Sequence, residues 1–567
     1  MGVCWDGIVS KLINDPADVV LEGLEGTALI QPGITLLTGR AIAVRSNQIV
    51  TDANRGTVGV AVISGGGSGH EPAHAGYVAD GMLAAAVAGG VFSSPSVDAV
   101  LDAIRTVTGD AGALLVVKSY TGDRLNFGLA AEIARTEGLA VEMVVVGDDV
   151  SLGDTDTHAG RRGLAGTVLV HKAAGAMATA GKPLAEVAAV ARRVADTVRT
   201  MGVGLSACTV PGADGPGFEL GDDEMELGLG IHGERGVERA PIGTADEVVA
   251  TLVNRALDDL VDDDDAHEGR DPERTVLLLN NTGGTPPAEL AIACRAALTT
   301  ARRRTEVVRL WQGHVMTSLE MAGVSVSVLG VDDELLALLD APTGSLAWPG
   351  AGQHTVPELN RIDPPVAAAD APSGTSDPLA RKGIDAVCRA ILDAEDDLTR
   401  RDQVLGDGDL GTALARGARA WLDDPREGTA AELLRHLSAV VRREVGGTSG
   451  PLYAVGLLRA AEVMQDAGSD NPWPQALRAG TDALMELGGA ARGEKTMVDA
   501  LDPAADAAVG AASDPLAAAI EAAEKGIADT VESTASKGRA SYLGGRSAGE
   551  ADPGAVAVLC WLRALRG

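Results

Sequence analysis

The second half of the chain places three aspartates close together on a glycine-rich turn. Asp402, Asp407 and Asp409 lie in DQVLGDGDLGT, where glycines separate them. Carboxylate oxygens bind hard cations, and Mg²⁺ is favoured over a caged Ca²⁺ where the phosphates of a substrate complete its coordination shell. No glutamate follows at the spacing that an EF-hand loop requires. The pattern therefore predicts a magnesium site, with a polar connection between helices as the alternative.

A second glycine-rich stretch, VGGTSGPLY, follows at residues 445–453. It precedes an apolar run with helical spacing, so its backbone N–H groups are expected to point outward at the start of a helix, where they bind anions. Two later segments, GEKTMVDAL (493–501) and SKGRASYLGGRSAGEADPGA (536–555), supply cations, hydroxyl groups and further glycine turns. The chain lacks the GxxxxGK[ST] phosphate loop and the H-R-D and D-F-G motifs of protein kinases. Any nucleotide site is therefore of another kind.

The first half contains ISGGGSGHEPAHAGY at residues 63–77, in which an apolar run leads into glycines and then His70. Glycines let a backbone approach a ligand closely, and a histidine in this position lies at the edge where α/β sheets bind their ligands. This segment is therefore a candidate ligand site. A phosphate loop or a simple tight turn is the alternative.

Two other positions in the first half carry groups that could act on a substrate. Lys118 and Asp123 lie in VKSYTGDRLNFG, at the end of another expected strand. The carboxylate is a candidate general base and the lysine could hold a hydroxyl or phosphate oxygen, with a surface ion pair as the alternative. His232 lies in MELGLGIHGERG, where glycines make it more accessible than a core histidine. It is a candidate catalytic residue, and a structural histidine is the alternative.

Strands that alternate with helices are expected to position these first-half residues. Apolar, β-branched runs occur at 58–67, at 112–123, at 141–150 and three more times between 273 and 333. Ala-rich amphipathic segments lie between them, such as residues 184–202. This alternation predicts an α/β half with largely parallel sheets. We expect it to span residues 1–352 as two α/β subdomains that divide near 190–250.

The remainder of the chain has a different character. A segment rich in Pro, Ala, Ser and Asp at 353–377 is typical of an interdomain linker. Beyond it, apolar side chains recur at helical spacing, and one such stripe consists of Ile384, Val387, Cys388, Ile391, Leu392 and Leu398. Residues 378–567 are therefore expected to form an all-α bundle or barrel.

The composition limits the partners and the compartment. The formal net charge is −33, which disfavours binding to nucleic acid and to anionic membranes, because both need patches of Lys and Arg. The sequence has neither a signal peptide nor an apolar stretch long enough to cross a membrane. The five cysteines are scattered and lack CxxC spacing, which is typical of free thiols in a reducing compartment. We therefore expect a cytoplasmic protein.

Along nearly its whole length, the chain resembles the single-chain dihydroxyacetone kinases. Four segments are similar to the ketose-binding half of that family: GGGSGHEPAHAGYVADGM, KSYTGDRLNFGLA, LGLGIHGERG and VMTSLEMAGVSVSVL. Four more are similar to its nucleotide-binding half: LGDGDLGT, GGTSGPLY, GEKTMVDAL and GRASYLGGRSAGEADPGA. The resemblance implies ATP-dependent phosphorylation of dihydroxyacetone by a homodimer, with Mg²⁺ as cofactor. It implies an α/β ketose-binding half followed by an all-α, nucleotide-binding helical barrel.

The resemblance also implies roles for residues of the ketose-binding half. His232 would form a covalent hemiaminal with the carbonyl carbon of the substrate, which would select ketones and aldehydes over polyols such as glycerol. His70 would hydrogen-bond the substrate and help to polarise it, and Asp123 would be the base for the hydroxyl that is phosphorylated. Gly67 and Lys118 would complete the ketose pocket.

In the helical half, the resemblance implies that the three aspartates Asp402, Asp407 and Asp409 hold Mg²⁺ ions that bridge the phosphates of ATP. The nucleotide itself would contact Thr412, Gly446, Gly447, Thr448, Ser449, Met497, Gly538 and Arg539. The chain departs from the family at Ser119, where Asn is common, and at Leu410, which replaces Thr, Cys or His. Neither change removes a catalytic group, but Ser119 lies near enough to the pocket to affect which ketose is preferred.

Other functions fit parts of the same pattern. A kinase of erythrulose or glyceraldehyde would use the same motifs, and pocket volume would decide between them. An FAD-AMP cyclising lyase would use the same helical half and divalent metal. A non-catalytic ketose sensor is disfavoured, since sensors lose catalytic or metal residues that this chain keeps. A phosphotransferase-system partner is disfavoured, since those systems split the two halves into separate chains.

Overall fold

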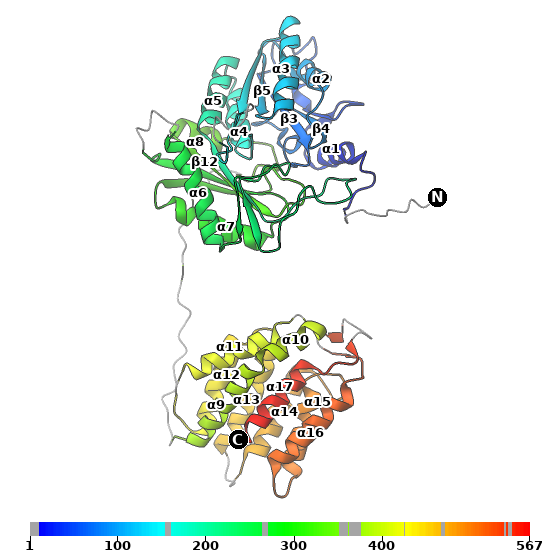
Figure 1. The fold of residues 1–567 in the computed structure, drawn as a ribbon, viewed down its shortest axis with the longest axis vertical. Coiled ribbons are helices and arrows are strands. Elements are labelled where there is room, and N and C mark those ends of the chain that lie inside the picture. The colour runs from blue at the N-terminus through cyan, green and yellow to red at the C-terminus, as the bar shows by residue number, and fades with distance from the viewer. Residues whose placement is uncertain are drawn as a thin grey trace, which may run out of the picture. The chain divides into compact units, whose positions relative to one another are not determined.

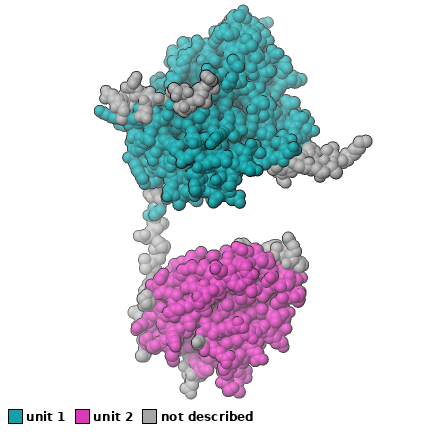
Figure 2. Space-filling model, in the orientation of Figure 1, with its two compact units in different colours: residues 1–361 teal, residues 362–567 magenta. Residues whose placement is uncertain are grey.

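The computed structural model of the chain describes residues 11–152, 160–262, 270–350, 356, 361, 376–406, 408–424, 426–466, 471–537, 540–541 and 547–566. The chain forms two compact units, residues 1–361 and 362–567 (Figure 2). Most of the expected linker, 353–377, lies outside the described residues. Within the described ranges, no helix combines the length and the apolar character that crossing a bilayer would require.

The first unit begins with a six-stranded sheet whose central strands pair in parallel (Figure 1). Its strand order is β1-β2-β4-β3-β5-β6, in which β4, β3, β5 and β6 pair in parallel, and β1 and β2 pair antiparallel at one edge. Strands β3 and β5 are buried along their whole length, which explains their continuous runs of apolar and small residues. The strands are β1 (Ile34–Leu36), β2 (Ile42–Arg45), β3 (Ala61–Ser68), β4 (Ala85–Val91), β5 (Ala113–Lys118) and β6 (Val141–Val146).

The second sheet departs from the expected parallel pattern. Its order is β11-β10-β12-β7-β8-β9, and its four pairings other than β10–β11 are antiparallel. The expectation of largely parallel sheets is therefore wrong here, because β7, β8 and β9 follow one another without the crossover helix that parallel pairing needs. The strands are β7 (Arg199–Gly204), β8 (Glu224–Leu227), β9 (Glu238–Pro241), β10 (Arg274–Asn281), β11 (Glu306–Gly313) and β12 (Gly323–Gly330).

Helices cover both faces of both sheets. Alternate residues of β5 point into different cores: one core lies against α2 and α3, and the other is shared with α4, α5, α8 and β10 of the second sheet. The far face of the second sheet packs on α6 and α7. The shared middle core joins the two sheets into one unit. The helices of the first unit are α1 (Val19–Ile30), α2 (Val97–Val107), α3 (Thr121–Thr136), α4 (Thr167–Thr179), α5 (Leu184–Thr197), α6 (Ala245–Asp262), α7 (Pro287–Ala301) and α8 (Asp333–Asp340), with 3₁₀ turns η1 (Ser46–Gln48) and η2 (Ala75–Tyr77).

The second unit is all-helical within the described residues, which confirms the expected all-α fold. Neighbouring helices close a ring in the order α9, α11, α12, α13, α14, α15, α16, α17 and back to α9 (Figure 1). The helices of the ring line an open pocket of about 580 Å³, whose side chains are almost all apolar. The helices are α9 (Pro378–Asp393), α10 (Glu395–Leu405), α11 (Leu410–Leu422), α12 (Ala430–Glu444), α13 (Ser449–Asp466), α14 (Trp473–Gly488), α15 (Val498–Gly510), α16 (Pro515–Thr530) and α17 (Pro553–Ala564).

Local sequence signals explain where several of these helices begin. Helices α9, α16 and α17 each start with an Asp-Pro pair, in which the aspartate side chain accepts hydrogen bonds from the first turn and the proline occupies the first helical position. Helix α12 begins with a capping box between Thr429 and Glu432. Helix α5 ends at Thr197, so the last part of the segment 184–202, which was expected to be helical, forms the start of β7 instead.

Candidate functional site

Two histidines that were expected to act on the substrate lie side by side in the first unit. His70 follows β3 of the first sheet, and His232 follows β8 of the second. Their ring centroids are 4.8 Å apart in an edge-on arrangement. The rings of Phe92 and Tyr120 lie 5.2 Å and 4.7 Å from that of His232. Packing among three rings fixes the plane of the His232 imidazole.

A neighbouring carboxylate sets the tautomer of His232. The Nδ1 atom of His232 lies 2.7 Å from Oε1 of Glu234, and the backbone N–H of His232 donates to Oε2 of the same residue. Burial by itself would raise the pKa of Glu234, but the hydrogen bond from the His232 side chain and the electrostatic attraction to it outweigh burial and lower that pKa to about 2. An ionised carboxylate only accepts hydrogen bonds, so Nδ1 carries the proton and Nε2 keeps its lone pair. His232 is therefore prepared to act as a nucleophile through Nε2.

His70 is held in the same tautomer by a backbone carbonyl. Its Nδ1 lies 2.7 Å from the carbonyl oxygen of Thr317, which can only accept. Burial, followed by the nearby Lys118 and His232, lowers the pKa of His70 well below 6.5, so the ring is neutral. Its Nε2 is buried without a hydrogen-bond partner in the described part of the chain. The expected polarising role needs a donor, whereas this tautomer offers a substrate hydroxyl an acceptor.

Lys118 and Asp123 converge on the glycine segment from adjacent elements. Lys118 ends β5, but Asp123 lies in the first turn of α3 and not at a strand end as expected, because the helix begins at Thr121. A Cβ atom added at Gly66 would lie 2.9 Å from Lys118 Nζ and 3.3 Å from Asp123 Oδ2. Both side chains are almost completely buried, so the surface ion-pair alternative is wrong. Burial lowers the pKa of Lys118, and Asp123 opposes that shift.

The remaining polar contacts leave part of this cluster free for a ligand. Asp123 Oδ1 accepts a hydrogen bond of 2.5 Å from Ser94, which leaves Oδ2 on the side of Gly66. Lys118 Nζ makes no hydrogen bond to another described residue. A Cβ atom at Gly67 would lie 2.7 Å from the backbone nitrogen of Ser93, so only glycine lets these two segments approach so closely.

The aspartate-rich turn joins two helices of the second unit. Asp402 lies in α10 and accepts a 3.1 Å hydrogen bond from the backbone of Leu410, while Asp409 is the N-cap residue of α11. Asp407 lies outside the described residues, and the described part of the chain contains no cluster of three His, Cys, Asp or Glu side chains that could hold a metal. The carboxylate oxygens of Asp402 and Asp409 suit Mg²⁺ chemically. The metal site stays a prediction.

A further carboxyl group lies close enough to the turn to respond to its charge. Burial raises the pKa of Asp552 to about 7, and the charges of Asp499 and Asp402 add to that rise. Asp552 is also the N-cap residue of α17, where it accepts a hydrogen bond from Ala555. Sequence reasoning did not single out this residue.

The VGGTSGPLY segment lies at the start of a helix, as the sequence predicted. Helix α13 begins at Ser449, and Gly446, Gly447 and Thr448 before it are exposed. Gly447 has a φ of +67°, which favours glycine. The exposed Arg416 donates from Nε to the carbonyl oxygen of Glu444 just before the turn. Exposed amides at a helix start, with a cation beside them, suit a phosphate.

The other expected nucleotide residues have mixed placements. Thr412 is exposed in the first turn of α11, and its Oγ1 donates to the carbonyl oxygen of Asp409. Met497 is buried at the start of α15 and packs close to Gly554. Gly538 and Arg539 lie outside the described residues. A nucleotide contact by any of these residues stays a prediction.

Comparison with known proteins assigns both units. Residues 26–347 match the Dak1 domain, and residues 404–567 match the DAK2 domain. The chain belongs to the dihydroxyacetone kinase family. It is 42% identical to a triokinase/FMN cyclase of Homo sapiens over 98% of both chains. It is 43% identical to a putative 3,4-dihydroxy-2-butanone kinase of Solanum lycopersicum over 98% of this chain and 97% of the other.

A solved structure of the family agrees with the fold of both units. The dihydroxyacetone kinase of C. freundii, crystallised in complex with AMP-PNP and Mg²⁺, is 34% identical to this chain. The comparison covers 98% of this chain and 99% of that one, with a TM-score of 0.66. The resemblance to dihydroxyacetone kinases that the sequence indicated is therefore confirmed. The expected order of an α/β half followed by an all-α half is confirmed as well.

Several residues that contact His70 and His232 escaped sequence reasoning. Glu234 could have been found, because it follows His232 by two positions and a nucleophilic histidine needs an acceptor for its other nitrogen. Phe92, Tyr120 and Thr317 carry no such local signal. The fold alone brings them to the two histidines, from just after β4, just after β5 and the segment between β11 and β12.

Proposed function

We propose that this protein is a kinase that transfers the γ-phosphoryl group of ATP to a hydroxyl group of a short ketose, with dihydroxyacetone as the leading substrate. The observation that carries the proposal is a set of buried polar atoms near His232. His70 Nε2, Lys118 Nζ and Tyr120 Oη have no hydrogen-bond partner among the described residues. Leaving such groups unpaired costs roughly 1–3 kcal/mol each. This group of unpaired atoms therefore suits a small ligand rich in oxygen.

His232 would hold the ketose by a covalent bond. Its Nε2 lone pair forms a bond to the carbonyl carbon, the π electrons move to the carbonyl oxygen, and that oxygen takes up a proton from solvent. The positive charge that develops on the imidazole is stabilised by Glu234, toward which the Nδ1 proton shifts. The product of this step is a hemiaminal. A polyol such as glycerol has no carbonyl group and is excluded.

The buried groups around the adduct would then orient it. His70 Nε2 accepts a hydrogen bond from a hydroxyl of the adduct, and Lys118 holds one of its oxygens. Asp123 Oδ2 takes the proton of the hydroxyl that attacks the phosphoryl group, while Ser94 keeps the other carboxylate oxygen in place. A three-carbon substrate offers little surface for binding, so a covalent link supplies orientation that contacts alone could not.

The second unit would hold the nucleotide. Asp402, Asp407 and Asp409 supply oxygen ligands for Mg²⁺, and the backbone amides at 446–449 face the phosphates. When bound, Mg²⁺ neutralises the charge on the phosphoryl group during transfer. We assign the ketose site to residues 1–352 and the nucleotide site to 378–567, joined by a linker at 353–377. As the family resemblance implies, we also propose a cytoplasmic homodimer.

The substrate proposal is tested by a coupled assay with ATP and Mg²⁺. Dihydroxyacetone, both enantiomers of erythrulose, glyceraldehyde and glycerol are compared by kcat/KM. We expect dihydroxyacetone to rank first and glycerol to be inactive. Preference for erythrulose would keep the mechanism and change the substrate, whereas turnover of glycerol would contradict the hemiaminal.

Two further arms separate the remaining alternatives. Incubation with FAD and a divalent metal tests for cyclising lyase activity; the name of the human relative includes the words FMN cyclase. The variant His232→Ala, crystallised with dihydroxyacetone, should lack the covalent link that the unmodified protein shows. Electron density for a free ketose beside His232 in the unmodified protein would disprove the covalent step.

A further inference from the structure

Lys495 lies in the GEKTMVDAL segment, but its ammonium group does not face a ligand. Its Nζ donates to the carbonyl oxygens of Val531 at 2.8 Å, Ser533 at 3.0 Å and Ser547 at 2.6 Å. These bonds use all three donors of an ammonium group. The side chain is also 1% exposed. The cation that this motif was expected to supply is therefore already satisfied by backbone.

The three carbonyl groups belong to the two ends of one loop. We call residues 531–549 the 531–549 loop, of which the structure describes 531–537, 540–541 and 547–549. Two more hydrogen bonds tie its ends together, from the backbone of Ala535 to Ser547 Oγ and from the backbone of Gly549 to the carbonyl oxygen of Val531, both 2.9 Å long. Lys495 lies at this neck and binds both ends at once.

The 531–549 loop packs on the helix that leads into the aspartate-rich turn. Ala535 and Ala540 form a buried cluster with Leu405, the last residue of α10. Leu405 directly precedes the turn that contains Asp407 and Asp409. A change in the loop would therefore be transmitted through this apolar contact to the proposed metal ligands.

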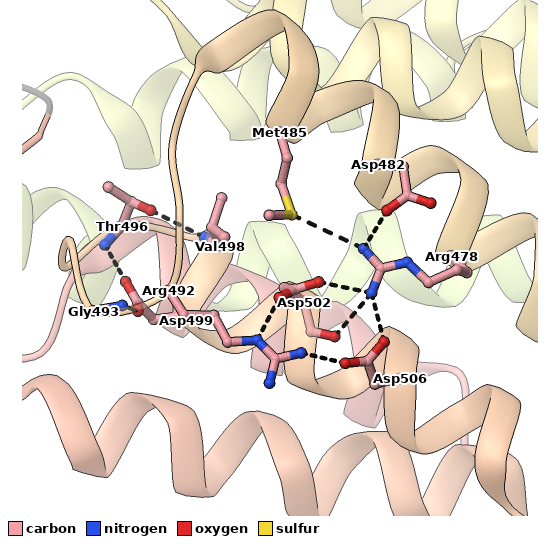
Figure 3. Close-up of polar contacts among 10 residues, drawn as sticks. All are labelled: Arg478, Asp482, Met485, Arg492, Gly493, Thr496, Val498, Asp499, Asp502 and Asp506. Carbon is pink, nitrogen blue, oxygen red and sulfur yellow. Dashed lines mark hydrogen bonds and ion pairs between the residues drawn. The ribbon is translucent and has the colours of Figure 1, made fainter.

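The segment that carries Lys495 is itself held firmly in place. Asp499 accepts hydrogen bonds from the backbone of Gly493 and Thr496, on both sides of Lys495 (Figure 3). Arg492 donates to Asp502 and Asp506 of α15. These contacts stabilise the φ of +60° at Lys495, which is unusual for a residue other than glycine.

We propose that Lys495 is a positioning residue of the nucleotide site, which closes the neck of the 531–549 loop and so holds the loop against Leu405, the residue that precedes the aspartate-rich turn. The predicted effect on ATP binding rests on the proposed function. The predicted effect on the order of the loop does not. Lys495 acts through the loop and does not touch the nucleotide.

The test compares Lys495→Met with Lys495→Arg and with the control Lys525→Met, which removes an exposed lysine from α16 of the same unit. Hydrogen exchange of the protein without nucleotide should rise in the 531–549 loop of Lys495→Met, while helices α14 and α16 keep their protection. The KM for MgATP should rise ~10–100-fold, as for other residues that orient ligands from outside the contact layer. The KM for the ketose should not change. Lys495→Arg should restore part of the loss.

A second variant tests the same proposal in case Lys495→Met does not fold. Ser547→Ala removes the Oγ acceptor at the neck without touching Lys495. It should give the same effects in milder form, and the double variant should lose less than the sum of the two. Effects of Lys495→Met and Ser547→Ala on the KM for MgATP that simply add in the double variant would overturn the proposal. A raised KM for MgATP with no change in the hydrogen exchange of the loop would also overturn it, because Lys495 would then be a direct ligand. If the unmodified protein binds no ATP, the proposed function fails, while the exchange result still decides the role of Lys495 in the loop.

Discussion

The protonation states of His232 and His70 are set by individual neighbours. Glu234 fixes the proton of His232 on Nδ1, and the carbonyl group of Thr317 does the same for His70. The two rings then present Nε2 lone pairs with different surroundings. His232 is partly exposed and can form a bond, whereas His70 is completely buried and can only accept. Two residues of one type thus have separate roles.

Glu234→Gln should weaken the attack of His232 without removing the imidazole. The amide no longer carries the charge that stabilises the developing imidazolium and that excludes the other tautomer. We expect the KM for the ketose to rise ~10–100-fold, with the KM for MgATP unchanged. Nitrogen-15 NMR of the His232 ring should show a mixture of tautomers. The control is Glu238→Gln, an exposed carboxylate on β9 that pairs with Arg255. Equal effects from both variants would argue against orientation by Glu234.

Asp123→Asn should leave the ketose bound but slow its phosphorylation. The amide cannot take a proton from the attacking hydroxyl, and a positioned base typically contributes ~10²–10⁴-fold to the rate. We therefore expect kcat to fall within that range, while the covalent adduct with His232 still forms. Asp110→Asn, a change of the same kind at an exposed position, should behave like the unmodified protein. An unchanged kcat for Asp123→Asn would refute the assignment of the base.

At the scale of elements, strand β3 and helix α4 bury a pair of histidines behind the site. His171 Nε2 lies 3.1 Å from Ser64 Oγ, which donates to the carbonyl oxygen of Val116, and His74 Nδ1 lies 3.4 Å from the same Oγ. Burial, followed by the charge of Lys118, lowers the pKa of His171 to about 3. Burial likewise lowers the pKa of His74 well below 6.5. The packing of these two elements requires neutral imidazoles.

This packing predicts a loss of stability in mild acid. Because the pKa of His171 is lower in the folded state than its ordinary value of 6.5, the unfolded chain binds the proton more readily. The stability is therefore complete above about pH 6.5 and falls as the pH drops toward 3, by ~2 kcal/mol at pH 5 from this residue alone. His171→Gln, which keeps a donor for Ser64, should lose correspondingly less between pH 7.5 and 5.

Hydrogen exchange of peptides from β3 and α4, corrected for intrinsic rates, measures this loss. His314→Gln, at an exposed position, is the matched control and should follow the unmodified protein. His74 and His70 contribute in the same direction and remain in every variant, so the slope should decrease but not disappear. A slope for His171→Gln equal to that of the control would show that His171 is not protonated on unfolding in this range.

The elements differ in how far the sequence could predict them. Strands such as β3 and β5 were recognisable because they are buried on both faces and flanked by turn residues. The all-α half was recognisable because residues such as Ile384, Cys388 and Ile391 recur at helical spacing and are buried. The antiparallel pairing of β12 with β10 and β7 was not, because pairing direction depends on contacts between distant segments. The same holds for the site, where Phe92 and Thr317 reach the histidines only through the tertiary fold.

At the scale of the whole molecule, the chain separates the two binding tasks. The groups proposed to bind the ketose all lie in the unit of residues 1–361, and those proposed to bind the nucleotide all lie in the unit of 362–567. Each unit has apolar cores of its own. A change in the ligand-binding residues of one unit should therefore leave binding in the other unit intact, although activity needs both.

Asp409→Ala and His232→Ala test this separation in opposite directions. A ligand at a hundred times its Kd stabilises the folded state by ~2.7 kcal/mol, which raises the melting temperature by roughly 5–10 °C for a unit of this size. MgATP should give such a shift in the unmodified protein and in His232→Ala, but not in Asp409→Ala, and a chelator should reduce it. Calorimetry should show binding of dihydroxyacetone to the unmodified protein and to Asp409→Ala, but not to His232→Ala. Neither variant should be an active kinase.

The control is Asp423→Ala, which removes an exposed carboxylate at the other end of α11 and should keep both ligands and activity. Since three neighbouring carboxylates repel one another unless a cation neutralises them, an equal thermal shift with ATP in the presence and absence of Mg²⁺ would contradict the metal assignment. Loss of ketose binding in Asp409→Ala would contradict the separation of the two sites.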